Sequence, residues 1–137
     1  MGQLYRIFCK ACGSSAGVSE GVGMRCRNTF EDLFMNYMSK DDRVRFAVSL
    51  PELHTNSIKR CTYTETPLRC PKCLTLTSTV IWSVELREGW NCKSSSKCGS
   101  CSAELETFTF PGEGEFRCQC WACGSDTLNV ELEALWD

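Results

Sequence analysis

Histidine is nearly absent from the sequence: His54 is the only one among 137 residues. This scarcity argues against a catalytic zinc site, which usually has His or carboxylate ligands and keeps one coordination position open. No Ser/His/Asp set and no Gly-rich phosphate-binding loop can be recognised either. His54 could be a metal ligand, but it lies near Pro51 in an expected loop, where a solvated side chain is the simpler interpretation. We therefore expect that the protein is not an enzyme.

Long hydrophobic runs are also absent. No stretch approaches the roughly 20 apolar residues of a membrane-spanning helix. Near the N-terminus, Arg6 and Lys10 enclose only three apolar residues, too few for the apolar region of a secretory signal peptide. Gly2 does not begin a myristoylation motif, because position 6 is Arg rather than Ser or Thr. We therefore expect a cytoplasmic protein with reduced thiols and no membrane partner.

Positive charge is not concentrated in any dense run. The net charge is −2, with 14 Lys or Arg and 9 Asp or Glu in residues 1–100, against one Arg and eight acidic residues in 101–137. This asymmetry favours a protein partner that binds through the acidic C-terminal part, because nucleic-acid-binding domains are usually strongly basic. A nucleic-acid interface would use the cations Arg25, Arg27, Lys40, Arg43, Arg45, Lys59, Arg60, Arg69 and Lys72 and the aromatic residues Phe46, Tyr63, Trp82 and Trp90.

Cysteine, in contrast, is abundant, with 12 in the chain. At this level, cross-links usually replace a large hydrophobic core in a small protein. Disulfides provide such cross-links in oxidising compartments, and metal ions provide them in reducing ones. Because the cysteines occur in close pairs and we expect a reducing compartment, we favour metal binding. A secreted, disulfide-linked domain is the alternative.

Eight of the cysteines form four C-x-x-C units: Cys9/Cys12, Cys70/Cys73, Cys98/Cys101 and Cys120/Cys123. Two intervening residues allow one tight turn to present both thiolates to a single ion, with backbone N–H groups pointing at the sulfurs. Gly13 and Gly124 follow two of the pairs, where such turns often need a positive φ. Each pair also has a Lys or Arg within three positions, which would offset the charge of a zinc ion held by four thiolates.

The spacing leaves the pairing of these units open. We prefer to join the second unit to the third, because they enclose a segment of ordinary zinc-ribbon size. The first unit would then join the fourth, or be completed by the single cysteines Cys26 and Cys61. Three sites can also be drawn, for example 9/12/26/61, 70/73/98/101 and 92/118/120/123. Loop cysteines such as Cys26 and Cys92 would otherwise be ordinary free thiols, and with only two sites Cys118 would be a spare thiol.

Hydrophobic periodicity predicts one clear helix. The apolar residues at positions 30, 33, 34, 37 and 38 fall on one helical face, which we interpret as the cover of a small core rather than a groove for a partner. Asn28 or Thr29 can cap this helix, and two acidic residues lie in its first turn, where the helix dipole favours them. Residues 41–53 fit either a strand or a helix, and Pro51 ends both.

Segments rich in β-branched and aromatic residues predict strands at 3–9, 58–66, 74–86, 103–110 and 127–136. Residues 17–24 are expected to form a turn or a strand edge, and 91–101 a serine-rich loop. We predict a small metal-stapled α+β fold, with zinc-ribbon or rubredoxin-like knuckles, short antiparallel β-hairpins and one or two helices in residues 28–50. An N-terminal zinc-knuckle and helical part (1–66) and a C-terminal zinc-ribbon β part (67–137) would form one compact unit.

Several motifs resemble those of a family of small, uncharacterised bacterial zinc-ribbon proteins. They are the opening MGQLYRIFCKACG, the GVGM at 21–24, the CPKC at 70–73 and the terminal Trp-Asp, and they cover roughly a third of the chain. The resemblance implies that Cys9, Cys12, Cys70 and Cys73 are zinc ligands. The chain departs from the family around Cys61, where RCTYTE stands in place of a second complete knuckle. The family implies no activity.

These observations favour a zinc-binding structural or adaptor protein that binds a protein partner and holds two or three zinc ions per chain. One alternative is a nucleic-acid-binding zinc ribbon. A second is a rubredoxin-like redox protein, because a tetrahedral four-sulfur site also accepts iron. A thioredoxin-like dithiol centre at Cys98/Cys101 would need a βαβ context that the sequence lacks.

Overall fold

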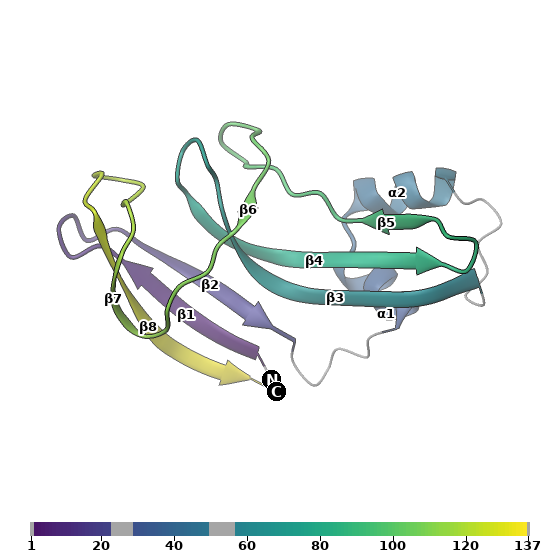
Figure 1. The fold of residues 1–137 in the computed structure, drawn as a ribbon, viewed down its shortest axis with the longest axis horizontal. Helices are drawn as coiled ribbons and strands as arrows, with labels where there is room; N and C mark the ends of the chain where they lie inside the picture. The colour runs from purple at the N-terminus through teal and green to yellow at the C-terminus, as the bar shows by residue number, and fades with distance from the viewer. Residues whose placement is uncertain (1, 23–28, 50–56, 137) are drawn as a thin grey trace.

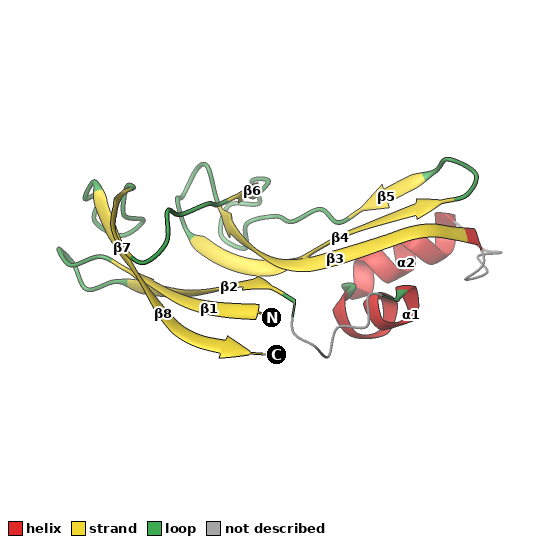
Figure 2. Cartoon of the chain, turned by 60° about the horizontal axis from the view of Figure 1, so that its bottom comes forward, coloured by secondary structure: helices red, strands yellow, loops and turns green. Residues whose placement is uncertain are grey.

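The computed structural model describes residues 2–22, 29–49 and 57–136. The strands are β1 (Gly2–Phe8), β2 (Ser15–Gly21), β3 (Ile58–Arg69), β4 (Leu76–Leu86), β5 (Asn91–Lys93), β6 (Glu106–Thr107), β7 (Gly114–Arg117) and β8 (Thr127–Trp136). They form one antiparallel sheet in the order β5–β4–β3–β2–β1–β8–β7, with β6 paired to β3 (Figure 1). The helical segments are α1 (Phe30–Asp32), the π-helical turn η1 (Leu33–Tyr37) and α2 (Lys40–Ser49), and they lie against the end formed by β3, β4 and β5 (Figure 2).

The sheet is nearly interrupted where β2 meets β3. β1 and β8 pair along most of their lengths, and β3 and β4 pair from Ile58↔Leu86 to Arg69↔Leu76. β2 and β3, in contrast, pair only at Gly21↔Glu65. The chain therefore forms two halves. We call β1, β2, β7 and β8 the terminal half, and the helices with β3, β4 and β5 the central half.

Each half has its own hydrophobic core. The core of the terminal half consists of Ile7, Cys9, Val18, Phe108, Cys120, Leu128 and Val130. The core of the central half consists of Leu33, Met38, Phe46, Tyr63, Trp82, Val84 and Leu86. Because side chains alternate along a strand, the cross-strand pair Tyr63↔Trp82 is buried, whereas the neighbouring pair Thr62↔Ser83 is exposed on the opposite face. The β-rich patterns at 58–66, 74–86 and 127–136 thus predicted real strands.

The predicted helix is present, but it widens after its first turn. Thr29 Oγ1 accepts a hydrogen bond from Asp32 N (3.2 Å), as expected of an N-cap. A hydrogen bond from Met38 N to Leu33 O (2.8 Å) then closes a π-helical turn. Leu33 and Met38 are both buried in the central core, with Phe30 and Phe34 packed against it. The prediction that this face covers a core is therefore confirmed.

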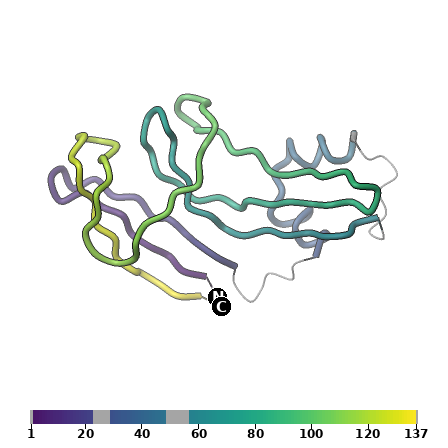
Figure 3. The backbone as a smooth tube through the Cα atoms, in the orientation of Figure 1, coloured from purple at the N-terminus to yellow at the C-terminus, as the bar shows by residue number. Residues whose placement is uncertain are grey.

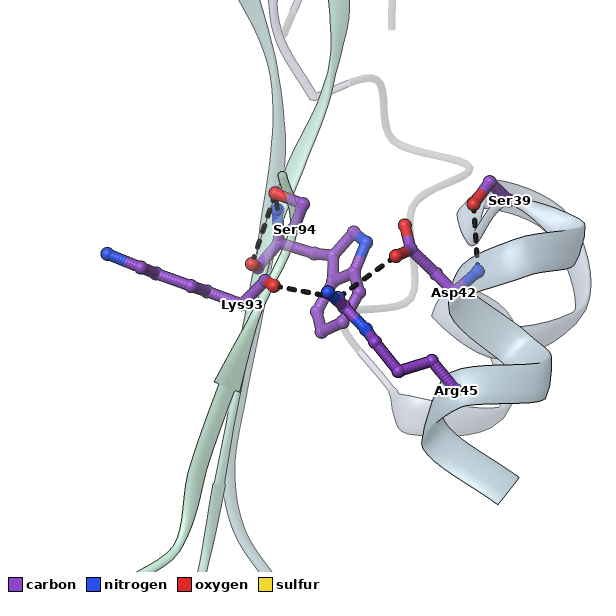
Figure 4. A network of polar contacts seen from close by, with 6 residues as sticks. Ser39, Asp42, Arg45, Lys93 and Ser94 are labelled. Atoms are coloured by element: carbon purple, nitrogen blue, oxygen red, sulfur yellow. Dashed lines mark hydrogen bonds and ion pairs between the residues drawn. The ribbon is translucent and has the colours of Figure 1, made fainter. Parts of the chain in front are cut away.

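Residues 41–53, whose pattern fitted a strand or a helix, form α2 as far as Ser49. Ser39 Oγ accepts a hydrogen bond from Asp42 N (3.1 Å) and caps the helix. Arg45 makes an ion pair with Asp42 (3.0 Å) and donates a hydrogen bond to Lys93 O (3.2 Å), which joins the helix to β5 (Figure 4). The predicted end at Pro51 lies outside the described residues.

The strand predicted at 103–110 is wrong for most of its length. Only Glu106–Thr107 pairs with the sheet, as β6. The reason is that this segment crosses from the central half to the terminal half (Figure 1). Phe108 N donates to Pro67 O (2.9 Å), while the Phe108 side chain enters the terminal core. β5 and β7, at three and four residues, were too short to be predicted.

The two halves are nested in the chain rather than consecutive. The terminal half is built from both ends of the sequence, β1–β2 and β7–β8, and the central half is inserted between them. The two ends of the chain consequently lie side by side (Figure 3). The boundary expected between residues 66 and 67 falls inside β3.

Candidate metal centres

All four C-x-x-C units fold into the same tight turn. In each, the N–H of the first cysteine donates to the carbonyl oxygen five residues later, at 2.7–3.0 Å. The N–H of the residue four positions later donates back to the carbonyl of the first cysteine, at 2.8–3.1 Å. We call these turns knuckles: Cys9–Gly13, Cys70–Leu74, Cys98–Ser102 and Cys120–Gly124. The repeated hydrogen bonds allow each knuckle to present two sulfurs to one ion.

The last residue of every knuckle has a positive φ: 77° at Gly13, 63° at Leu74, 59° at Ser102 and 74° at Gly124. Glycine adopts this conformation readily, whereas a residue with a Cβ atom is disfavoured by about 1–2 kcal/mol. The sequence predicted this requirement for Gly13 and Gly124 only. Among the described residues, Leu74 and Ser102 are the only residues other than glycine with a positive φ, so their knuckles form against a local backbone preference.

The first candidate centre, which we call the outer set, consists of Cys9, Cys12, Cys120 and Cys123. Its sulfurs all lie within 4.8 Å of one another, with 3.7 Å between Cys9 and Cys123 and 3.8 Å between Cys12 and Cys120. Four sulfurs at about 2.3 Å from a tetrahedral zinc ion would be roughly 3.8 Å apart, so the spacing fits such an ion. The two knuckles meet because β1 and β8 are neighbours in the sheet. Cys26, the alternative candidate, lies outside the described residues.

The second candidate centre, the inner set, consists of Cys70, Cys73, Cys98 and Cys101. Its sulfurs also lie within 4.8 Å of one another, and the Cys70–Cys101 and Cys73–Cys98 distances are both 3.4 Å. This is the pairing that the sequence favoured. Thr75, which no sequence pattern identified as part of the site, also lies beside this set. Its hydroxyl is 3.1 Å from Cys73 Sγ and 3.7 Å from Cys98 Sγ.

Burial divides the ligands of both sets in the same way. The first cysteine of each knuckle is buried, and none of these four is more than 6% exposed. The second cysteine is exposed in three knuckles, and Cys73 is half-buried. An ion in either set would therefore be covered by the protein interior on one side. On the solvent side it would be covered by the sulfurs of the exposed cysteines. With four thiolates bound, no coordination position would remain for water or a substrate.

Backbone N–H groups lie close to the buried sulfurs. The amide of Cys73 is 3.4 Å from Cys70 Sγ, and the amide of Ala122 is 3.4 Å from Cys120 Sγ. Such bonds stabilise a negatively charged sulfur and are expected around a four-thiolate metal centre. The knuckle thus supplies part of the charge compensation that the sequence suggested would come from nearby Lys and Arg.

The same donors favour the thiolate form. At Cys98, the amides of Ser100 and Cys101 lower the pKa of the thiol to about 6. At Cys12, hydrogen bonding with the Ser14 hydroxyl (3.3 Å) and then with the Ser14 backbone lowers the pKa to about 6. Backbone groups of Ala103 and Ser125 lower the pKa of Cys101 and Cys123, but hydrogen bonding with neighbouring sulfurs raises the pKa of Cys101 to about 11 and that of Cys123 to about 12. Thiolate is the form that binds metal ions, so all four cysteines of a set would be ionised near neutral pH only around a bound cation.

Cys118 belongs to neither set. Its Sγ accepts a hydrogen bond from Arg69 Nη1, and Arg69 Nη2 donates to the carbonyl of Gln119. We expected Arg69 to offset charge at the pair that begins with Cys70, but its guanidinium reaches the segment that leads into the outer set. The contact joins residues 49 positions apart, and the sequence contains no signal for it.

Cys61 and Cys92 also lie apart from both sets. Each pairs with Val84 in β4, Cys61 from β3 and Cys92 from β5, and both pack against the central core. Burial raises the pKa of the Cys92 thiol, as expected for a side chain that fills space. Cys61 was a candidate ligand, and the structure places it beside the core and outside the two groups. The candidate ligand His54 lies outside the described residues.

Comparisons of the chain with protein-family models, with curated proteins and with solved structures found no match. In the described part of the chain, no helix has the length and apolar character needed to cross a membrane. The two groups of four cysteines, with no disulfide among the described cysteines, could each hold a metal ion.

The positive φ angles predict opposite effects of glycine and alanine. We expect Gly13→Ala to lower the free energy of unfolding by about 1–2 kcal/mol, because a Cβ atom disfavours the left-handed conformation. Ser102→Gly should raise it by about 0.5–1 kcal/mol for the converse reason. Denaturant unfolding of metal-loaded protein measures both. Gly99→Ala is the matched control, because Gly99 also lies in a knuckle with open space around it but lacks a positive φ. Equal losses for Gly13→Ala and Gly99→Ala would contradict the explanation.

The position of Cys118 predicts that it is dispensable for metal binding. Cys118→Ser should leave two metal ions per chain, whereas Cys120→Ser should leave about one, because only Cys120 belongs to a four-sulfur group. Elemental mass spectrometry on native protein gives the count, with Cys61→Ser as a second neutral control. Loss of an ion from Cys118→Ser would instead support a third site.

Proposed function

We propose that this protein is a zinc-binding adaptor, in which two zinc ions fix a β-scaffold whose surface binds a partner protein. The observation that carries the proposal is that both candidate centres are closed sets of four cysteines, held by knuckles that close three β-hairpins and one loop. Ions held in this way cross-link the scaffold and offer no position for catalysis. Zinc suits the role because it has no redox chemistry and accepts tetrahedral sulfur ligands.

A rubredoxin-like iron protein is the second candidate. The specific observation in its favour is the knuckle itself, since the same turns and the same sulfur spacing fit either ion. Exposed second cysteines would also leave an iron centre close to the surface, where electrons could be exchanged with a partner. The identity of the metal separates the two candidates.

The aromatic residues favour a protein partner over a nucleic acid. Phe46, Tyr63 and Trp82 are only 2%, 5% and 2% exposed, because they form the core of the central half. Buried rings cannot stack on bases, which is how sequence-tolerant binding to single strands gains much of its energy. Of the four aromatic candidates, only Trp90 is exposed.

Several of the candidate cations are also occupied within the protein. Lys59 makes an ion pair with Glu85 (2.9 Å), and Arg45 makes one with Asp42 (3.0 Å). Arg69 donates to groups in the other half of the molecule. These interactions reduce the positive charge offered to phosphates and further favour a protein partner.

The acidic residues of the C-terminal part offer a suitable surface. Glu115 on β7 and Glu133 on β8 are exposed, and Glu131 on β8 is exposed but lies 4.0 Å from the guanidinium of Arg6. Glu113 Oε1 accepts a hydrogen bond from Leu132 N (3.1 Å), which satisfies an amide on β8 beyond the end of its pairing with β7. An acidic sheet edge of this kind would attract a basic surface of a partner and exclude acidic ones.

Metal analysis and metal removal test the proposed centres. We expect two zinc ions per chain, and we expect chelation at neutral pH to abolish most of the β-sheet signal in circular dichroism, because buried cysteines of the outer set are part of the terminal core. Restoring zinc should restore the signal. Unchanged circular dichroism after verified removal would contradict structural sites, and a red protein containing iron would favour the second candidate.

A gel-shift assay at low salt tests the preference against nucleic acids. We expect no shift of random-sequence single-stranded or duplex DNA or of RNA by the zinc-loaded protein, because its aromatic candidates are buried and several cations are paired. A strongly basic zinc protein serves as the positive control. A shift that disappears as salt is raised would support the nucleic-acid alternative.

A further inference from the structure

Arg69 makes a direct side-chain connection between the two candidate metal centres. We propose that this connection couples the centres, so that an ion in the inner set raises the affinity of the outer set for its own ion. The inference rests on the proposed function, since it requires both sets to bind metal. It goes further because it makes metal binding at one centre depend on metal binding at the other.

One end of the connection is anchored in the inner set. Arg69 is the last residue of β3 and directly precedes Cys70. Its Nε donates a hydrogen bond to Leu74 O (3.3 Å), and Leu74 is the last residue of the same knuckle. Leu74 is held there with a positive φ by its own bond to Cys70 O (3.0 Å). The orientation of the guanidinium group therefore depends on the knuckle that an inner ion would fix.

The other end of the connection binds the segment that leads into the outer set. Arg69 Nη1 and Nη2 donate to Cys118 Sγ and Gln119 O, the two residues immediately before Cys120. Cys118 N in turn donates to Asp126 O (2.9 Å), across the base of the same turn. The guanidinium thus positions the start of a knuckle that supplies half of the outer ligands.

Phe108 keeps this guanidinium in place. The Arg69 Cζ atom lies 5.7 Å from the centre of the Phe108 ring, within the range of a cation–π interaction. Phe108 belongs to the terminal core and donates from its N–H to Pro67 O on β3 (2.9 Å). The ring therefore lies between the two halves and restricts where the Arg69 side chain can point.

Other hydrogen-bonded strand contacts between the halves are sparse in the described chain. β2 and β3 pair only at Gly21↔Glu65. β6 adds the pairs Leu68↔Thr107 and Arg69↔Glu106, within the crossing segment. The Arg69 side chain, which bonds Leu74 in one knuckle and the two residues just before the other, therefore connects the two sets directly. Energetic coupling between two binding sites is reciprocal, so each ion would strengthen the binding of the other.

A thermodynamic cycle tests the coupling with zinc alone. The affinity of the outer set is measured by competition with a chelator of known affinity, in the native chain and in a variant whose inner set is disabled by Cys98→Ser and Cys101→Ser. We expect the disabled inner set to weaken zinc binding at the outer set by about 10–100-fold, the range typical for loss of a group that orients metal ligands. In an Arg69→Gln background, the outer affinity should already be reduced, and disabling the inner set should have little further effect.

Two further variants distinguish the hydrogen bonds from charge and from general damage. Arg69→Lys keeps the positive charge but lacks the planar guanidinium, which donates to Cys118 and to Gln119 at the same time. It should therefore behave like Arg69→Gln. Arg60→Gln is the matched control, because Arg60 is an exposed arginine on the same strand and should leave the coupling unchanged. Circular dichroism of each zinc-loaded variant checks that the fold is intact.

Native mass spectrometry during zinc titration gives an independent readout. The native chain should pass from the metal-free to the two-zinc form with little one-zinc species, whereas Arg69→Gln should accumulate the one-zinc species at half-saturation. The inference is overturned if the inner set affects the outer affinity equally with and without Arg69, or if the native chain fills its two sites independently. A native chain that binds no metal would instead overturn the proposed function.

Discussion

The mutual repulsion of closely packed thiolates is the constraint on which this structure depends. Each set gathers four sulfurs within 4.8 Å, and such a group is stable as thiolates only around a cation. The fold is built towards that end: every knuckle closes a hairpin or loop, and amide N–H groups lie near the sulfurs. Cys9 and Cys120 are also members of the terminal core, so a metal ion bound by the outer set would share ligands with the hydrophobic packing there.

Two small cores explain why such cross-links are needed. Within the described ranges, each core contains seven buried residues, and the halves share a sheet in which β2 and β3 are joined by a single residue pair. A core of this size contributes little net stability after the entropy of ordering the chain is subtracted. Metal ions bound by the four-sulfur sets would supply the missing stability as cross-links at the knuckles.

Local signals in the sequence were sufficient for the elements that depend on local chemistry. The C-x-x-C spacing predicted all four knuckles, and the pairing of the inner set followed from its compact spacing. The apolar face that includes Leu33 and Met38 was predicted to cover a core. The π-helical turn between these two residues was not predicted, because the hydrophobic pattern has the period of an α-helix. The long strands β3, β4 and β8 were also predicted, because their β-branched and aromatic residues repeat over many positions.

Several of the features that were not predicted depend on distant parts of the chain. Whether the first cysteine pair joins Cys120/Cys123 depends on the adjacency of β1 and β8, which no local pattern specifies. The contact between Arg69 and Cys118 has the same origin. Phe108 belongs to a segment with strand-like composition, yet this segment crosses between the halves. It does so because the Phe108 side chain packs in the terminal core.

The nested order of the two centres has a consequence for synthesis of the protein. The contacting cysteines of the inner set are 25 and 31 positions apart, whereas those of the outer set are 108 and 114 positions apart. A ribosome therefore releases all inner ligands well before the outer group can be completed. Cys9 and Cys12 emerge first and are joined last. An ion that needs all four outer cysteines could therefore bind only after the last knuckle has been made.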